Sequence, residues 1–230
     1  MIERIVCILI GYVCGLFQTG YILGRIKGID IREHGSGNAG TTNTLRTMGA
    51  KYGALVLLGD ALKCGVAVLI AKLIFGQSHS DVLPILMIYA AMGTILGHNF
   101  PCYMNFKGGK GMAATAGFVI FALGGKMTLI NLVIFFGIFF VTHYVSLASI
   151  TVYIGLVISA FVYWYFDLFG FTQKGKPGCY IEYFIIMLFL AVMAIVRHKE
   201  NIKRLLKGEE RKTYLKSKPI LDVDKKNEQS

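Results

Sequence analysis

Long apolar segments alternate with short polar loops along most of the chain. The apolar segments cover about residues 5–24, 53–75, 82–101, 112–125, 127–145, 146–166 and 180–196. Most of them approach the roughly 20 residues with which an α-helix crosses about 30 Å of hydrocarbon. We therefore expect an all-α, polytopic membrane protein with about seven transmembrane helices. Segment 112–125 would be roughly 20 Å long if fully helical, so we expect a tilt or local thinning of the bilayer where it crosses.

The composition agrees with a location in a membrane. Hydrophobic residues make up 55% of the chain and charged residues 16%, against about 45–50% and about 25% in soluble domains. The first apolar segment begins almost at Met1 and lacks a small-residue cleavage site, so we expect a retained span. The five cysteines are scattered, without a CxxC pair, which disfavours a zinc site or a disulfide framework.

The basic residues gather on one side of the predicted membrane topology. With seven crossings, loops 25–52 and 102–111 and the tail from Arg197 share a side and carry 18 of the 24 Lys and Arg residues. Positively charged loops stay in the cytoplasm, so we expect the N-terminus outside and the C-terminus in the cytoplasm. We expect residues 1–210 to form one integral membrane domain and the polar residues 211–230 to be a disordered cytoplasmic tail.

Three unusual polar segments fall on this predicted cytoplasmic side, and the first is EHGSGNAGTTNTLRTMGA, residues 33–50. Its small residues can present N–H and hydroxyl donors to an anion; those that we expect to bind substrate are Gly35, Gly37, Asn38, Thr42 and Asn43, next to Ser36. Arg46 adds a planar guanidinium that suits a phosphate. Thr41 stands where a P-loop needs Lys, which excludes nucleotide hydrolysis. A solvated turn remains the alternative.

The second segment is GHNFPCYMNFKGGKG, residues 97–111. Anchoring at the membrane surface would explain Lys107 and Lys110 but not the glycines around them, which are Gly108, Gly109 and Gly111. These glycines allow backbone amides to approach a ligand, and an apolar helix, whose N-terminus favours anions, follows Gly111. We therefore expect an anion-binding loop. His98 is a hydrogen-bonded structural residue or a base, and the sequence favours the structural role.

The third segment is RHKENIKRLLKGEE, residues 197–210. If it is helical, His198 and Asn201 share a face, with Arg197 and Arg204 nearby. Such a face can bind an oxyanion or handle a proton. An amphipathic helix that lies on acidic lipids is the alternative, and both interpretations can hold together.

One acid and one base lie inside the predicted second span. Asp60 and Lys63 are three residues apart, so on a helix their side chains can neutralise each other and lower the cost of burial in lipid. We expect a structural ion pair here, in preference to a proton relay. None of the three polar segments offers a cluster of His, Cys, Asp and Glu, so we expect no metal.

In this order, the three segments resemble the cytoplasmic signatures of the bacterial acyl-phosphate:glycerol-3-phosphate acyltransferases, a family of integral membrane enzymes. The resemblance extends from the first span to about Glu210. It implies transfer of a fatty acyl group from acyl phosphate to glycerol 3-phosphate, which gives lysophosphatidic acid and phosphate in the first acylation step of phospholipid synthesis. It also implies a site on the cytoplasmic face of the bacterial inner membrane, without a metal, a cofactor or nucleic acid. The oligomeric state stays open.

The resemblance also implies roles for single residues. Ser36 and Arg46 match the functional serine and arginine of the first signature, and His198 and Asn201 match the functional pair of the third. The glycines and lysines of residues 107–111, which are Lys107, Gly108, Gly109, Lys110 and Gly111, match the family's glycerol-3-phosphate-binding loop. The need for several cations to hold two anions adds Arg204 to the residues that we expect at the substrates. We expect direct attack by the glycerol hydroxyl, because no base stands next to Ser36 in the sequence pattern. Glu210 matches a closing acid, for which we expect a structural role.

Two other functions would also gather cations on a membrane protein. A transporter of phosphate or a phosphate ester would place them at broken helices near mid-membrane, often within an internal repeat, whereas here they lie in loops and no repeat is evident. A scaffold that binds anionic lipid would lose binding gradually as charges are removed. The acyltransferase is the interpretation that we favour.

Overall fold

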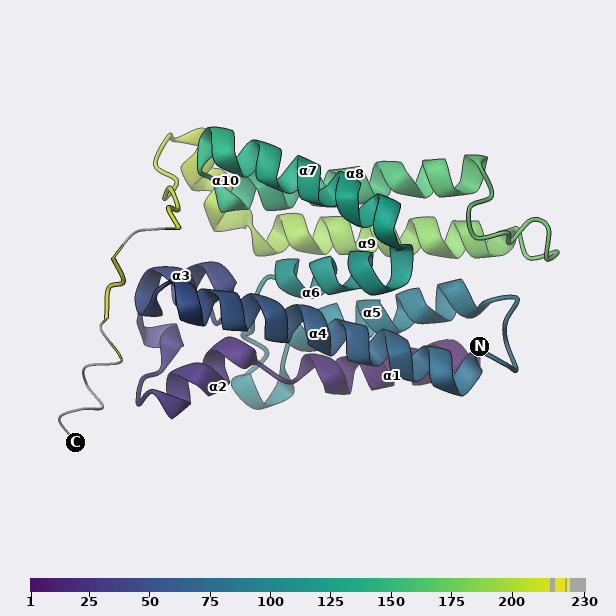
Figure 1. The fold of residues 1–230 in the computed structure, drawn as a ribbon, viewed down its shortest axis with the longest axis horizontal. Coiled ribbons are helices and arrows are strands. Elements are labelled where there is room, and N and C mark those ends of the chain that lie inside the picture. The colour runs from purple at the N-terminus through teal and green to yellow at the C-terminus, as the bar shows by residue number, and fades with distance from the viewer. Residues whose placement is uncertain (216–217, 222, 224–230) are drawn as a thin grey trace.

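The apolar segments form helices where the hydrophobic pattern predicts them (Figure 1). The computed structural model describes residues 1–215, 218–221 and 223. In chain order its elements are α1 (Ile2–Gly15), α2 (Thr19–Ile26), η1 (Ile31–Glu33), α3 (Thr41–Met48), α4 (Ala50–Phe75), α5 (Leu83–Asn99), η2 (Cys102–Met104), α6 (Met112–Phe118), η3 (Val119–Leu123), α7 (Gly125–Thr142), α8 (Val145–Tyr165), α9 (Gly178–Arg197) and α10 (Lys199–Leu206).

Six stretches of these residues are long and apolar enough to cross a membrane: Ile2–Ile26, Ala50–Phe75, Leu83–Met104, Gly125–Thr142, Val145–Tyr165 and Gly178–Arg197. The all-α membrane architecture is thereby confirmed. Residues Met112–Leu123 are apolar but shorter and reach only about 18 Å at 1.5 Å per residue. The crossing expected there stays a prediction, and so does the count of seven.

Although α6 and η3 together are short, the loop before α6 and the turn after α7 still lie at the same end of the bundle (Figure 1). The chain reverses at Gly124, whose φ of +82° suits glycine, and α7 runs back toward the end of the bundle where α6 begins (Figure 1). The loop before α6, the turn after α7 and the segment after α9 therefore lie at one end, together with α3. We call this end of the bundle the motif end.

Small residues allow the central helices to approach closely. Gly11 and Gly15 form a GxxxG pair on α1, and Gly93 and Gly97 form another on α5. A Cβ atom at any of these four positions would overlap with backbone atoms of the partner helix. In lipid, where apolar burial drives little association, such close backbone packing is a main source of helix affinity.

The first span is broken between α1 and α2, which the apolar pattern does not predict. The break frees carbonyl groups that lipid cannot satisfy. The buried amide of Gln18 fills this need, because its Nε2 donates to the Gly15 carbonyl at 3.2 Å and to the His98 carbonyl at 3.1 Å. The break therefore fixes the start of α2 against the end of α5.

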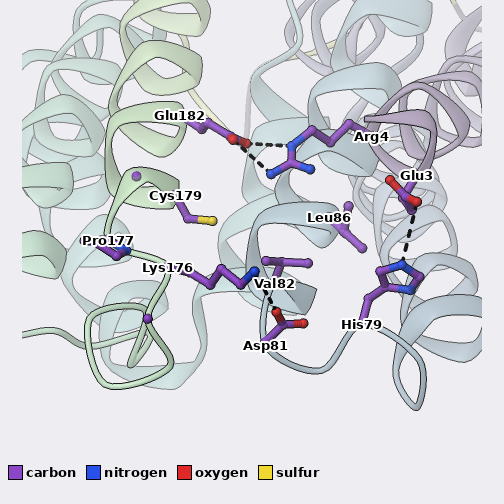
Figure 2. A pocket seen from close by; sticks show the side chains of 12 residues that line it. Glu3, Arg4, His79, Asp81, Val82, Leu86, Lys176, Pro177, Cys179 and Glu182 are labelled. Atoms are coloured by element: carbon purple, nitrogen blue, oxygen red, sulfur yellow. Dashed lines mark hydrogen bonds and ion pairs between the residues drawn. The ribbon is translucent and has the colours of Figure 1, made fainter.

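Ion pairs join the helices at the opposite end of the bundle (Figure 2). Arg4 on α1 forms two hydrogen bonds with Glu182 on α9, at 2.7 and 2.9 Å. Two longer pairs connect Lys176 with Asp81 at 3.5 Å and His79 with Glu3 at 3.7 Å. At this pocket of about 470 Å³, Arg4 and Lys176 are thus paired with the carboxylates of Glu182 and Asp81.

Part of the predicted tail lies against the motif end. The Thr213 amide donates to the His143 carbonyl at 2.9 Å, and the Ile220 and Leu221 amides donate to carbonyls of α3 at 3.0 and 2.9 Å. Residues 216–217, 222 and 224–230 lie outside the described residues. The predicted disorder of the tail and the domain boundary at residue 210 stay predictions.

Candidate active site

The three polar segments line a single cavity of about 840 Å³ at the motif end. The predicted site residues that line it are Gly35, Ser36, Gly37, Asn38, Thr42, Asn43, Arg46, Lys107, Gly108, Lys110, Gly111, His198, Asn201 and Arg204. Gly109 is the one predicted site residue that does not line it. Segments almost 150 residues apart in the sequence are thus brought to one place by the helices that carry them.

The first segment forms a tight loop before α3, and Asn43 holds it together. Its Nδ2 donates to the carbonyls of Ile31 and His34 at 3.1 and 3.0 Å, while its Oδ1 accepts from the Ser36 amide at 2.8 Å. Asn43 is 2% exposed, so its polar atoms serve the loop, although the sequence predicts a substrate contact. The Ser36 side chain remains exposed at the cavity.

The second segment forms what we call the glycine loop, residues 107–111. Two of its amides bond to the end of α5: Gly108 to the Asn99 carbonyl and Gly109 to the His98 carbonyl, both at 3.1 Å. A Cβ atom at Gly108 would overlap with the His98 carbonyl oxygen, and one at Gly109 with the His98 ring. Close packing on α5 is therefore a physical reason for these two glycines.

The two lysines of the glycine loop have different surroundings. Lys107 is exposed, whereas Lys110 is half-buried and donates a hydrogen bond to Oδ1 of Asn201 on α10. Burial lowers the pKa of Lys110 to about 8, against the raising effect of Glu210. Lys110 is thus the lysine that joins the second segment to the third.

Arg197, which is not among the predicted site residues, fixes the glycine loop from α9. Its Nη2 donates to the carbonyls of both Gly108 and Gly109 at 2.7 Å, and its guanidinium lies 5.4 Å from the Phe100 ring centre. Arg197 also lines the cavity. Its place next to His198 in the third segment is the only sign of this role that the sequence carries.

Glu210 organises the third segment. Its Oε1 accepts from Asn201 Nδ2 at 2.7 Å and from Ser146 Oγ at 2.9 Å, and its Oε2 accepts from Arg204 Nε at 2.8 Å. Burial alone would raise the pKa of Glu210, but these hydrogen bonds lower it below its usual value. The carboxylate stays charged and holds Asn201 and Arg204 at the cavity wall, which matches the structural role expected for this residue.

His198 presents one nitrogen with a lone pair. Its Nδ1 lies 2.8 Å from the Ala194 carbonyl oxygen, and because a carbonyl only accepts, Nδ1 carries the hydrogen. Nε2 of the neutral ring is then an acceptor. Burial, followed by the charge of Lys110, lowers the pKa of His198 to about 4. The ring is therefore neutral at physiological pH.

Arg46 joins the first segment to the tail. Its Nη2 donates to the Arg211 carbonyl at 2.8 Å and to the Thr213 hydroxyl at 2.6 Å. Burial lowers the pKa of this guanidinium, although it stays charged because arginine titrates only above pH 12. Arg46 thus adds a fixed positive charge to the cavity.

The cavity also has an apolar part, which the sequence does not distinguish from ordinary lipid-facing surface. Its lining comes from α4, α6, η3 and α7 and includes Leu57, Leu58, Ala61, Ala116, Val119, Ile120, Leu132, Phe135 and Phe136. The same space is thus cationic at the motif end and apolar along the bundle. The fold is thus that of an integral membrane protein, with a cavity whose shape and charge suit an amphiphilic anion.

Comparisons with known proteins identify the family of this chain. The sequence profile of the glycerol-3-phosphate acyltransferases matches residues 5–208. A glycerol-3-phosphate acyltransferase of Alkaliphilus metalliredigens is 39% identical, over 91% of this chain and 95% of its own length. One of Clostridioides difficile is 40% identical, over 90% of this chain and 94% of its own length.

Solved structures give the same result. The glycerol 3-phosphate form of PlsY (YgiH), an integral membrane glycerol 3-phosphate acyltransferase, is 34% identical with a TM-score of 0.75, over 92% of this chain and 96% of that one. Its lysophosphatidic acid form is 33% identical with a TM-score of 0.73, over the same shares. The chain belongs to the glycerol-3-phosphate acyltransferase family, which confirms the predicted family.

Proposed function

We propose that this protein transfers a fatty acyl group from acyl phosphate to the 1-hydroxyl of glycerol 3-phosphate. The products are lysophosphatidic acid and inorganic phosphate. The observation that carries the proposal is the single cavity that all three polar segments line, cationic at one end and apolar along the bundle. A phosphorylated acceptor and a donor with a long acyl chain need these two environments side by side.

Charge supports the choice of two anionic substrates. The basic residues around the cavity are Arg46, Lys107, Lys110, Arg197, Arg204 and Arg211, against the acids Asp60, Glu200 and Glu210. Asp60 and Glu210 are already paired with Lys63 and Arg204. The cations that remain can hold two phosphate groups against their mutual repulsion, and holding two reactants in contact accounts for much of the rate of such a transfer.

The donor's acyl chain would lie in the apolar part of the cavity. The walls there come from α4, α6 and α7. Burial of each methylene is worth about 0.8 kcal/mol relative to water. The chain thereby supplies binding energy, and its phosphate end points to the motif end.

We infer that the acyl group moves directly between the two substrates. The glycerol hydroxyl oxygen forms a bond to the acyl carbon, the bond from that carbon to the phosphate oxygen breaks, and phosphate leaves. His198 Nε2 accepts a hydrogen bond from the attacking hydroxyl. With a pKa of about 4, this ring is a weaker base than a phosphate dianion, whose pKa lies near 6. The departing phosphate is therefore the better final proton acceptor.

Ser36 has a supporting role in this proposal. Its amide is held by Asn43 and its hydroxyl faces the cavity. None of the hydrogen bonds of the described residues links this hydroxyl to a base, so it is suited to orient a phosphate oxygen. Arg46 and Asn201 would fix the two phosphates with it.

We also propose that the motif end faces the cytoplasm of a bacterial cell, at the inner membrane. The loops that meet there carry most of the basic residues, and positively charged loops stay in the cytoplasm.

The proposal is tested by the purified protein in detergent micelles, where transport has no meaning. With labelled glycerol 3-phosphate and palmitoyl phosphate, we expect equal amounts of lysophosphatidic acid and inorganic phosphate. Palmitoyl-CoA in place of palmitoyl phosphate should give no product. Turnover with palmitoyl-CoA alone would contradict the proposed donor, and binding of glycerol 3-phosphate without any product would favour a transporter.

A further inference from the structure

A buried cation, Lys63, contacts two residues that line the cavity, Asp60 and His98, and His98 packs against the glycine loop. Lys63 on α4 is 6% exposed, and Asp60 and His98 are 1% and 2% exposed. The ammonium donates to the Phe17 carbonyl at 2.7 Å and to Asp60 Oδ1 at 2.9 Å, and it lies 2.9 Å from Nδ1 of His98. The Asp60–Lys63 ion pair expected from the sequence is present, but it extends to a third residue.

These contacts determine which nitrogen of His98 carries a hydrogen. An ammonium group has three N–H donors and no lone pair. Its donors meet three partners: a carbonyl, a carboxylate and the ring nitrogen. Nδ1 of His98 must therefore accept, and the neutral ring carries its hydrogen on Nε2.

The Nε2 edge of His98 faces the glycine loop. A Cβ atom at Gly109 would overlap with Nε2, so glycine alone leaves room for this edge. The His98 side chain lines the cavity. No acceptor for Nε2–H occurs among the hydrogen bonds of the described residues, so the structure holds a neutral, oriented donor whose partner is missing.

The geometry points to His98 as a substrate-binding residue: Nε2–H donates to the phosphate of glycerol 3-phosphate held on the glycine loop. Lys63 and Asp60 are positioning residues, because they act on the substrate only through the tautomer of His98. This inference rests on the proposed function and on the role in glycerol 3-phosphate binding that the family resemblance implies for residues 107–111. It changes the role expected for His98 and gives the buried ion pair a task in binding.

Three substitutions at one position separate a donor from a packing residue. His98→Gln keeps an N–H near the position of Nε2, whereas His98→Asn reaches only the position of Nδ1 and His98→Ala removes both. We expect the KM for glycerol 3-phosphate to rise about tenfold or more in His98→Asn and His98→Ala, the effect of losing one hydrogen bond to a charged group. His98→Gln should stay within about threefold of the wild type, and the KM for palmitoyl phosphate should change little in all three.

His79→Ala is the matched control, because His79 lies in the pocket at the opposite end of the bundle (Figure 2). It should leave both KM values unchanged. Equal effects of His98→Gln and His98→Ala would overturn the inference. So would a rise confined to the KM for palmitoyl phosphate, because Nε2–H of His98 would then bind palmitoyl phosphate in place of glycerol 3-phosphate.

A measurement without catalysis tests the tautomer itself. In the ¹⁵N spectrum of histidine-labelled protein in micelles, we expect the His98 signals to show a lone pair on Nδ1 and a hydrogen on Nε2. The double variant Asp60→Asn, Lys63→Met removes the positioning residues without leaving a single buried charge, and its His98 should show a mixture of tautomers. A hydrogen on Nδ1 in the wild type would overturn the inference, whatever the activity of the protein. If the wild type showed the expected tautomer but made no lysophosphatidic acid, the proposed function would fail instead.

Discussion

Lys110 in the glycine loop donates a hydrogen bond to Asn201 on α10, although the two residues are 91 positions apart in the sequence. This bond links the second polar segment to the third. Through Asn201 it continues to Glu210, which accepts from Asn201 Nδ2 at 2.7 Å. The cation that we assign to substrate binding is therefore oriented by an uncharged amide, which leaves its charge free for a phosphate.

The two lysines of the glycine loop should differ in importance. Lys110→Met should raise the KM for glycerol 3-phosphate about 10- to 100-fold, since a hydrogen bond to a charged group is worth about 1.5–3 kcal/mol. Lys107→Met should raise it less than about fivefold, because Lys107 is exposed and its charge is screened. Steady-state kinetics in micelles measures both. A larger effect at Lys107 would contradict the assignment.

The pH dependence of binding should follow Lys110. Burial lowers its pKa to about 8, so the free enzyme loses this positive charge as the pH rises through that value. We expect kcat/KM for glycerol 3-phosphate to fall about tenfold per pH unit above about pH 8. His198, with a pKa of about 4, stays neutral from pH 5 upward and should add no step there.

Lys110→Arg provides the control for this profile. A guanidinium remains charged over the whole accessible range, so the alkaline fall should disappear even if the overall rate is lower. An unchanged alkaline fall in Lys110→Arg would assign the titration to another group.

Arg197 should control the shape of the glycine loop. Lysine at this position carries the same charge but lacks the planar group that reaches both carbonyls of Gly108 and Gly109. Leaving these buried acceptors unsatisfied costs about 1–3 kcal/mol, and Arg197→Lys should raise the KM for glycerol 3-phosphate at least about tenfold. The exposed Arg25→Lys should behave like the wild type. Similar kinetics for the two variants would argue against this role.

The apolar part of the cavity should determine the preferred length of the acyl chain. Ile120 lies in η3, the part of its wall nearest the reversal at Gly124. Ile120→Trp fills this space, so the KM for palmitoyl phosphate should rise more than that for lauroyl phosphate, by about fivefold or more if two or more methylenes lose their contacts. An equal change for both chain lengths would place the acyl chain elsewhere.

Much of this organisation could be predicted from the sequence, because membrane helices follow from composition. Lipid requires about 20 apolar residues per crossing and allows few charges. The sequence therefore predicted the membrane helices and also that the three polar segments lie at the same end of the bundle. The candidate residues in the three polar segments could also be predicted, because glycines together with Lys and Arg between apolar segments indicate loops that bind anions. The ion pair between Asp60 and Lys63 followed from helix spacing alone.

Other features depend on contacts that no local pattern encodes. The break before Gln18 is stabilised by carbonyls of α5, a helix some 80 residues away in the sequence. Arg197 resembles an ordinary basic residue at the end of a span until its bonds to the glycine loop are known. Asn43 has the composition of a ligand-binding residue, yet its hydrogen bonds hold the loop before α3.

Direct transfer between two bound anions is tested most directly by phosphate exchange. The protein in micelles is incubated with palmitoyl phosphate and radiolabelled inorganic phosphate, without glycerol 3-phosphate, after the same preparation has been shown to make lysophosphatidic acid. Direct transfer predicts no label in palmitoyl phosphate, since the acyl group has no acceptor. Incorporation of label at a rate comparable to turnover would show an acyl-enzyme, on Ser36 or another residue, and would contradict the mechanism.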